Sequence, residues 1–360
     1  MRARNIKKRI TIGIAFACAA AVTVFWGLAV FYNERSIVID GNIRADNMPE
    51  EAEGGTLLVA SDDNECADGV NDDGTKIRSI GVMLAGDSTV RPLSGIGQAD
   101  IVIEMPVITG GINRFLAIFQ CTDAPEIGSI RSARDDFIPV AAAFDAVYGH
   151  WGGSHFALDK LKKGVIDNID ALQNPYNAYF RKNGIASPNN GFSSLSRMRT
   201  AAEKKGYRMT QKEGYEYARL SESEEGAATG TTVSIGYPGQ FGVSWIYDPV
   251  KKIYARSRGG REEIDKNTGL QVVASNVIVL STSIKQIEGQ YNDVRVTGDG
   301  EARIYRLGTE IVGKWKKDPN VLSSRILFVD GAGNEIPLAP GTTWLEYIDR
   351  TTQITVTPAT

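Results

Sequence analysis

A run of 23 residues without a charge, from Ile10 to Tyr32, constrains this chain more than any other feature. As an α-helix rising about 1.5 Å per residue it is about 35 Å long, enough to cross a hydrocarbon layer of about 30 Å. Basic residues precede it, namely Arg2, Arg4, Lys7, Lys8 and Arg9. We therefore expect residues 1–33 to form a cytoplasmic basic tail and a transmembrane helix, with the remainder held outside the cytoplasm.

Two alternatives to a single-pass anchor stay open. The small residues around Ala17 could be a signal-peptide cleavage site, although apolar sequence continues for more than ten residues beyond it. Cys18 could be a lipidated cysteine, although Ala15 and Phe16 lead into it poorly and no polar chain follows. The length of the apolar run favours an uncleaved helix and a location in the cell membrane.

Charge is distributed unevenly along the chain. Residues 1–33 carry five bases and no acid, residues 34–76 carry twelve acids and three bases, and the rest carries 32 bases and 31 acids. The acidic stretch 34–76 is typical of a linker, and Asp68–Gly74 within it lacks the ligand spacing of a calcium loop. A nearly neutral folded part gives no reason to expect nucleic acid as a partner.

Two cysteines lie beyond the anchor, Cys66 and Cys121. They could form a disulfide in an oxidising compartment or remain thiols, and the sequence does not choose between the two.

Residues 77–212 predict a mixed α/β domain, since strand-like runs alternate with helical ones. The runs that predict strands are 77–84, 101–107, 115–120 and 146–149, and those that predict helices are 133–144, 156–163 and 194–205. Gly164 and Gly206 follow the last two helices, where glycine commonly ends a helix.

Residues 231–360 predict a β-rich antiparallel domain, and the stretch 213–230 reads as a linker because of its glutamates. Turns are expected at Gly298–Gly300 and Asp330–Gly333. The predicted strands are 232–235, 243–247, 252–255, 276–281, 293–297, 302–307, 310–315, 325–329 and 343–347. The fold class is therefore α+β, with an N-terminal transmembrane helix before two domains.

Several stretches together resemble the YerB-like family of predicted bacterial lipoproteins, a two-domain family of unknown function. They are Arg91–Gly95 leading to Ala99–Glu104, Gly110–Phe115, Gly128–Arg134, Tyr148–Ser154, Asn276–Val279, Gly313–Lys317 and Pro340–Trp344. The resemblance implies an extracytoplasmic protein and no established activity. The chain departs from the family pattern in three places. The lipidation signal is degraded into a plain membrane anchor, His155 stands where proline is usual, and Asn189 stands where histidine is usual.

Catalytic and metal-binding candidates are few, because the chain has two histidines, His150 and His155. A metal site with Asp145 or Asp159 would need a spacing other than this i, i+5 pair, so we expect no metal and no cofactor. Ser154 could act as a nucleophile with His150 as base and Glu104 as acid or base. Its place before an apolar run favours a helix N-cap instead.

Arginines give the stronger functional signal. Arg131 and Arg134 are three apart at an expected helix start, and Arg114 follows two glycines. Guanidinium groups beside helix N–H groups suit a carboxylate or phosphate. We expect Arg114, Arg131, Arg134, His150 and Glu104 to line one anion-binding cleft. The alternative is that these arginines form ion pairs inside the fold with Glu104, Asp135 or Asp136.

Two functions remain open at this point. The first is an envelope binding or scaffold module that contacts an anionic polymer or a protein. The second is a hydrolase or transferase that acts on an anionic envelope substrate. The scarcity of histidine and the missing Gly-x-Ser-x-Gly motif favour binding.

Overall fold

The computed structural model describes residues 76–108, 111–120, 122–214, 217–220, 231–289 and 291–358. The predicted membrane helix, the predicted linker before Lys76, and both Cys66 and Cys121 lie outside these residues. Within the described ranges no helix is long and apolar enough to cross a membrane.

The first half of the chain is mixed α/β, as predicted. Its main strands are β1 (Ile80–Ala85), β2 (Ile101–Pro106), β3 (Asn113–Phe119), β5 (Val147–His150) and β6 (Asn168–Asp170). Its helices are α2 (Phe137–Ala143), α3 (His155–Lys162) and α4 (Leu195–Lys204). Each helix begins and ends within one residue of its predicted bounds, except that α2 begins four residues later than predicted.

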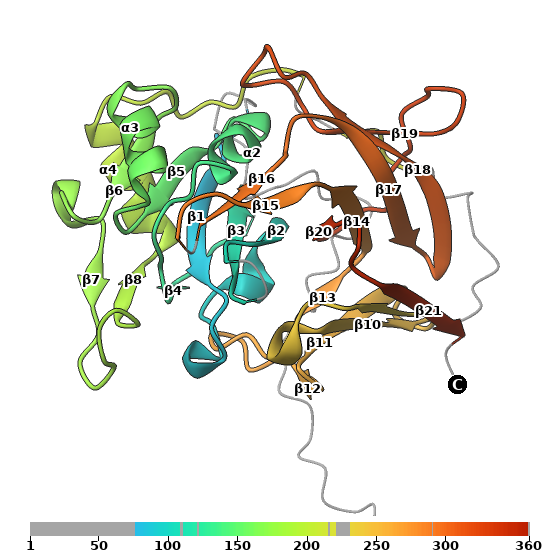
Figure 1. Ribbon diagram of the computed structural model, residues 1–360. Helices are drawn as coiled ribbons and strands as arrows, with labels where there is room; N and C mark the ends of the chain where they lie inside the picture. Colours follow the sequence, from blue (N-terminus) through green and yellow to red (C-terminus); the bar gives the residue numbers. More distant parts are fainter. Residues whose placement is uncertain are drawn as a thin grey trace, which may run out of the picture. The chain divides into compact units, whose positions relative to one another are not determined.

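The two faces of this part of the sheet are covered by different helices (Figure 1). Helix α4 packs Leu195, Met198 and Ala201 into one core, with β1 residues such as Val82. Helix α2 packs Phe137 and other residues into a second core, on the face of the sheet that carries Met83. The alternation of side chains along a strand therefore decides which core each strand residue enters.

A small sheet flanks α4. It consists of β4 (Ile127–Gly128), β8 (Gly191–Ser193) and β7 (Phe180–Arg181), in that order. The short 3₁₀ helix η4 (Pro175–Asn177) contacts α4 beside it.

The second half is β-rich and mostly antiparallel, which confirms the prediction. Its strands are β9 (Thr231–Ile235), β10 (Val243–Asp248), β11 (Ile253–Arg258), β12 (Arg261–Glu262), β13 (Val273–Ala274), β14 (Asn276–Thr282), β15 (Ile284–Gln286), β16 (Asn292–Val294), β17 (Gly298–Arg306), β18 (Thr309–Lys317), β19 (Leu327–Val329), β20 (Thr343–Asp349) and β21 (Ile354–Pro358). The turn expected at Gly298–Gly300 is wrong, because these residues begin β17 and pair with β18. The chain reverses instead at Leu307 and Gly308, where both φ angles are positive.

One ten-stranded sheet joins the two halves, in the order β19-β18-β17-β14-β20-β2-β3-β1-β5-β6. The joint is formed by β20, which pairs in parallel with β14 on one side and with β2 on the other. The predicted linker at 213–230 thus separates two stretches of sequence without separating two sheets.

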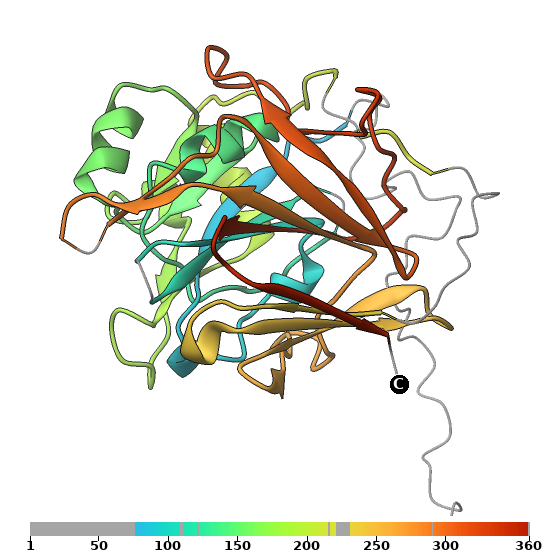
Figure 2. The same ribbon diagram turned by 45° about the vertical axis from the view of Figure 1, so that its right-hand side comes forward.

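A second sheet, in the order β12-β11-β10-β9-β21, packs against one face of the large sheet. In Figures 1 and 2 its gold strands lie beneath the long orange strands β17 and β18. Its inward residues Val233, Trp245 and Tyr254 share a core with Val82 and Leu84 of β1 and with Trp344 of β20. The two halves therefore share a hydrophobic core as well as a sheet.

Candidate functional site

Three arginines predicted from the sequence lie near one another, and two of them pair with the carboxylate of Asp87, which follows strand β1. Arg114 lies near the start of β3 and its Nη1 is 3.3 Å from Asp87 Oδ2. Arg131 Nη2 is 3.7 Å from the same oxygen. Arg134 lies close enough that its positive charge lowers the pKa of Arg114. We call Arg114, Arg131, Arg134 and Asp87 the arginine cluster.

The segment that carries Arg131 and Arg134 is not the helix start that the sequence suggested. Helix α2 begins at Phe137, and a turn at Asp135 and Asp136 precedes it. The N–H of Arg131 donates to Met83 O of β1 (2.9 Å) and the N–H of Ala133 donates to Gly152 O (2.9 Å). Arg131 and Arg134 therefore lie before the helix and do not share a helix face.

Arg131 is the most fully engaged of the three. Its Nη1 donates to Ser129 Oγ (3.0 Å) and to the carbonyl of Pro188, and its Nη2 donates to Asn189 Oδ1. Asn189 thus contacts the arginine cluster, at a position where the family pattern has histidine.

Arg114 and Arg134 keep unused donors. Arg134 Nη1 donates to Ala133 O (3.0 Å), and its guanidinium lies 5.4 Å from the ring centroid of Tyr291. The Nε atoms of both arginines are buried and have no hydrogen-bond partner in the described part of the chain. Buried donors without partners are costly, so a bound acceptor would stabilise this arrangement.

The pKa values of the three arginines also favour a bound acceptor. Burial lowers the pKa of Arg114 to about 10, and the charges of Arg134 and Arg131 add to this against the opposing effect of Asp87. Burial also lowers the pKa of Arg131 and of Arg134. A lowered pKa on a guanidinium means that the surrounding protein does not fully compensate its charge. An added anion would supply the missing compensation.

Glu104 does not join the arginine cluster, contrary to expectation. In the pairing of β2 with β3, Glu104 lies opposite Phe115, whereas Arg114 lies opposite Met105. Neighbouring side chains on a strand point to opposite faces, so Glu104 and Arg114 are on different sides of the sheet. Glu104 is fully buried, which excludes it from a surface cleft.

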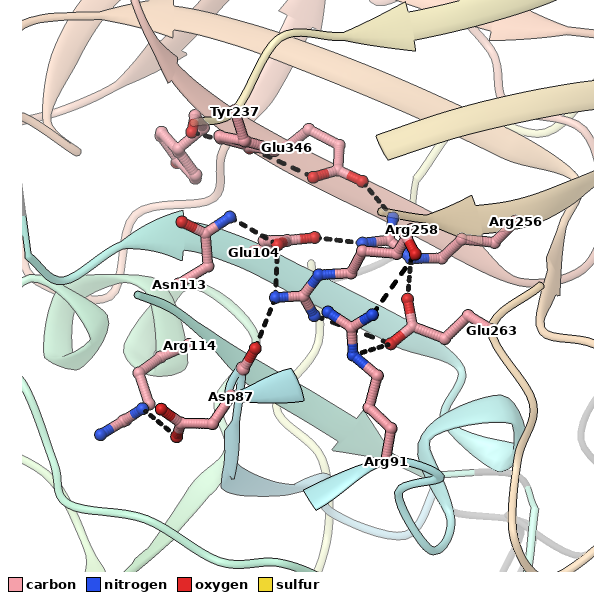
Figure 3. Close-up of polar contacts among 12 residues, drawn as sticks. Asp87, Arg91, Glu104, Asn113, Arg114, Tyr237, Arg256, Arg258, Glu263 and Glu346 are labelled. Atoms are coloured by element: carbon pink, nitrogen blue, oxygen red, sulfur yellow. Dashed lines mark hydrogen bonds and ion pairs between the residues drawn. The ribbon is translucent and has the colours of Figure 1, made fainter. Parts of the chain in front are cut away.

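Glu104 belongs instead to a network of buried ion pairs between the two sheets (Figure 3). At its centre, Arg256 Nη2 contacts Glu104 Oε2, Arg256 Nε lies 2.7 Å from Glu263 Oε2, and Arg256 Nη1 lies 2.6 Å from Glu346 Oε1. Arg258 Nη2 lies 3.7 Å from Glu104 Oε1, and Arg91 Nε lies 3.9 Å from Glu263 Oε1. We call these six residues the core ion network.

Neutral donors complete the core ion network. Asn113 Nδ2 donates to Glu104 Oε1 (2.6 Å), and Trp245 Nε1 donates to Glu346 Oε1 (3.2 Å). The Arg256 guanidinium also lies 4.1 Å from the ring centroid of Trp344.

The pKa values of two carboxylates in the core ion network shift in opposite directions. Burial raises the pKa of Glu346, and the nearby Glu104 adds to that effect although Arg256 opposes it. Burial would also raise the pKa of Glu263, but the charges of Arg256, Arg258 and Arg91 outweigh it and lower the pKa. The network therefore stabilises charge at Glu263 and disfavours it at Glu346.

His150 is also apart from the arginine cluster. Its side chain is buried, with Nδ1 2.8 Å from Gly152 O and Nε2 3.3 Å from Asn168 Oδ1. Both ring nitrogens are thus in contact with neighbouring groups of the protein.

Ser154 caps helix α3, because its Oγ accepts a hydrogen bond from the N–H of Ala157 (3.2 Å). The exposed His155 faces Glu288, with Nε2 3.2 Å from Oε2. Of the carboxylates considered as metal ligands, Asp145 binds Arg208 at 2.6 Å and Asp159 lies 4.0 Å from Lys162. The described residues contain no group of three or more possible metal ligands.

The comparisons with known proteins agree with the resemblance noted from sequence. Residues 68–208 match the N-terminal domain of the family described as "Protein of unknown function (DUF3048)", and residues 233–345 match its C-terminal domain. The chain belongs to this family.

A similar protein with a name and a similar solved structure both come from Bacillus subtilis. The protein named "Putative lipoprotein YerB" is 30% identical over 279 residues, which is 76% of this chain and 82% of that protein. The crystal structure of the YerB protein from the same organism superposes with a TM-score of 0.71 at 28% identity, covering 79% of this chain and 96% of that one.

Sequence reasoning missed Asp87 and the partners of Glu104 in the second half. A signal for Arg256 and Arg258 was present in β11. These two arginines occupy alternate positions of the strand, on the same face as the buried Tyr254, and the less buried Ala255 and Ser257 point to the other face. Charged residues at the buried positions of an alternating strand indicate a buried ion pair. Nothing local to Asp87 indicated that Arg114 and Arg131 would pair with it.

Proposed function

We propose that this chain is a membrane-attached extracytoplasmic binding protein that holds an oxyanionic group of an envelope polymer or protein at the arginine cluster. The observation that carries the proposal is the pairing of Arg114 and Arg131 with one carboxylate, with the charge of Arg134 close to Arg114 and buried donors left over. Guanidinium groups present paired N–H donors that fit the oxygens of a carboxylate or phosphate.

The local charge balance leaves room for an anion. Asp87 offsets one of the three arginines. Asp135 and Asp136 also raise the pKa of Arg134, but less than burial lowers it, and Asp135 is engaged by Lys160 at 3.2 Å. An incoming oxyanion would accept from the unpaired groups of Arg114 and Arg134 without displacing the contacts of Arg131 to Asn189.

Two observations support attachment to a membrane, namely the sequence before Lys76 and the name of a relative. The uncharged run from Ile10 to Tyr32 is long enough to span a bilayer, and the basic tail before it favours an N-terminus in the cytoplasm. The relative from Bacillus subtilis carries the name of a lipoprotein, which is a membrane-attached class of protein. We propose the same side of the membrane for this chain, with a helix as its anchor.

A binding role is favoured over catalysis by the engagement of the candidate catalytic groups. Ser154 Oγ caps a helix, both nitrogens of His150 contact Gly152 and Asn168, and Glu104 is buried in the core ion network. No contact in the described part of the chain assembles these three into one site.

Titration of the full chain with inorganic phosphate and sulfate in a nonionic detergent tests the proposal. Arg114→Lys and Arg134→Lys should each weaken phosphate binding by about tenfold or more, since a hydrogen bond to a charged group contributes about 1.5–3 kcal/mol. Arg350→Lys is the matched control, because Arg350 is exposed and remote in sequence from the cluster. A wild-type chain that binds neither anion, together with strongly destabilised Arg131→Ala and Arg114→Ala, would leave these arginines a purely structural role.

A further inference from the structure

A second positively charged surface lies on the first half of the chain, away from the arginine cluster. Residues 171–208 hold seven basic residues and one acid, in a chain whose net charge is -3. The bases are Arg181, Lys182, Arg197, Arg199, Lys204, Lys205 and Arg208, and the acid is Glu203. This stretch forms η4, β7, β8 and α4, at the left-hand side of Figure 1.

Helix α4 presents two of these bases on one face. Arg197 and Lys204 are seven residues apart, which is close to two helical turns, so they point the same way. Arg197 Nη1 donates to Asn177 O (2.8 Å), and Lys204 Nζ lies 5.8 Å from the ring centroid of Tyr176. The face of α4 and the short helix η4 therefore form one continuous surface.

The charges on this surface are not neutralised by the protein. Arg181, Arg197, Lys204 and Lys205 form no ion pair with an acid anywhere in the part of the chain that the structure describes. They lie instead over aromatic rings: Arg181 is 4.3 Å from Trp151, Arg197 is 5.3 Å from Phe180, and Lys205 is 5.2 Å from Tyr207. Lys182 differs, since it pairs with Glu126 at 2.8 Å.

Two large apolar side chains project from the same surface. Leu172 is 68% exposed and Tyr176 is 55% exposed. Tyr176 follows Pro175 in η4, and the positive φ angles of Asn174, Tyr176 and Asn177 shape the turn that carries it. Exposed apolar side chains flanked by basic ones mark an interaction site more often than a solvated face.

We infer that this surface, defined by Leu172, Tyr176, Arg197 and Lys204, docks against an anionic lipid membrane. Anionic headgroups complement the unpaired bases, and the boundary between headgroups and acyl chains accommodates leucine and tyrosine. A soluble acidic polymer would satisfy the charges but would leave Leu172 and Tyr176 exposed. The combination of charge with apolar side chains therefore favours a bilayer.

The inference is independent of the oxyanion site, because the four defining residues include none of the arginine cluster. Each base near an anionic membrane surface strengthens attraction by about fivefold, and this falls off within a Debye length. Docking would hold the first domain against the membrane at this surface.

Amide hydrogen exchange of the full chain, reconstituted in phosphatidylcholine vesicles with or without phosphatidylglycerol, tests the inference. Peptides covering residues 171–178 and 195–205 should exchange several-fold more slowly in the anionic vesicles. The protection should vanish near 1 M salt, where the Debye length is about 3 Å. The double variant Arg197→Glu/Lys204→Glu should weaken docking by roughly 25-fold from its two lost bases alone, and should lose the protection.

Matched controls separate docking from general effects of charge and polarity. Lys314→Glu/Lys316→Glu makes the same charge change at exposed positions of β18, and should keep the protection. Leu172→Ser should reduce it, whereas Leu270→Ser, at a residue 58% exposed, should not. Equal exchange in neutral and anionic vesicles would overturn the inference. So would protection by soluble polyphosphate with none by vesicles, which would indicate a polymer partner.

Discussion

Asp136 should make the stability of this protein depend on pH, and Asp136→Asn should remove that dependence. The carboxyl precedes helix α2, is 9% exposed, and its Oδ2 accepts a hydrogen bond from the N–H of Val294 (3.1 Å). Burial raises the pKa of Asp136 to about 8, and the charges of Asp135 and Asp293 contribute in the same direction.

The sign follows from the proton balance. An aspartate in an unfolded chain has a pKa near 3.9, so between about pH 4 and pH 8 the folded protein binds the proton and the unfolded chain does not. The free energy of unfolding must then decrease as pH rises through this window. The slope approaches about 1.4 kcal/mol per pH unit, which gives about 2.5 kcal/mol between pH 5 and pH 7.

Urea unfolding of the full chain in a nonionic detergent at pH 5, 6 and 7 measures this effect. Asparagine keeps the acceptor oxygen for Val294 and carries no charge at any of these pH values. The free energy of unfolding of Asp136→Asn minus that of the wild type should therefore grow by about 2.5 kcal/mol over the range. Asp299→Asn, at an exposed position, should run parallel to the wild type. Parallel curves for Asp136→Asn would refute the raised pKa and imply that water reaches the carboxyl.

Three further predictions follow from the fold. Arg256→Ala should lower the free energy of unfolding by about 3–5 kcal/mol, because it leaves Glu104, Glu263 and Glu346 buried without their shared partner, and chemical denaturation measures it. Fragments 77–212 and 231–360 should each fail to fold alone but should associate when expressed together, as judged by circular dichroism and co-purification, because β20 pairs with β2 across the boundary. Protease added to spheroplasts should digest residues 34–360, and protection of the C-terminal domain would contradict an extracytoplasmic location.

Local structure was predictable from this sequence because its signals are local. The position of Ser154 before an apolar run predicted that it caps a helix, and it does cap α3. Glycines at 164 and 206 adopt positive φ just after α3 and α4. Helix α2 began later than predicted because Ala133 O, which a helix would use to accept from the N–H of Phe137, accepts instead from the N–H of Ser154 (3.1 Å).

The arrangement of the strands was not predictable in the same way. The parallel pairing of β20 with β2 joins residues from opposite ends of the folded chain, and neither strand carries a mark of its partner. The candidate site was divided for the same reason. Arg114 and Glu104 are both polar residues at strand positions, and only the register of β2 against β3 shows that they face opposite sides of the sheet.

The loop after β1 contacts both the core ion network and the arginine cluster. Gly86 O accepts a hydrogen bond from Arg258 Nη2 of the core ion network (2.7 Å), and the next residue, Asp87, pairs with Arg114 and Arg131. A side chain at position 86 would lie 2.0 Å from Asn113 O, so glycine is required for the loop to approach β3 this closely. The loop after β1 therefore contacts the second half of the chain at Gly86 and the arginine cluster at Asp87, through two consecutive residues.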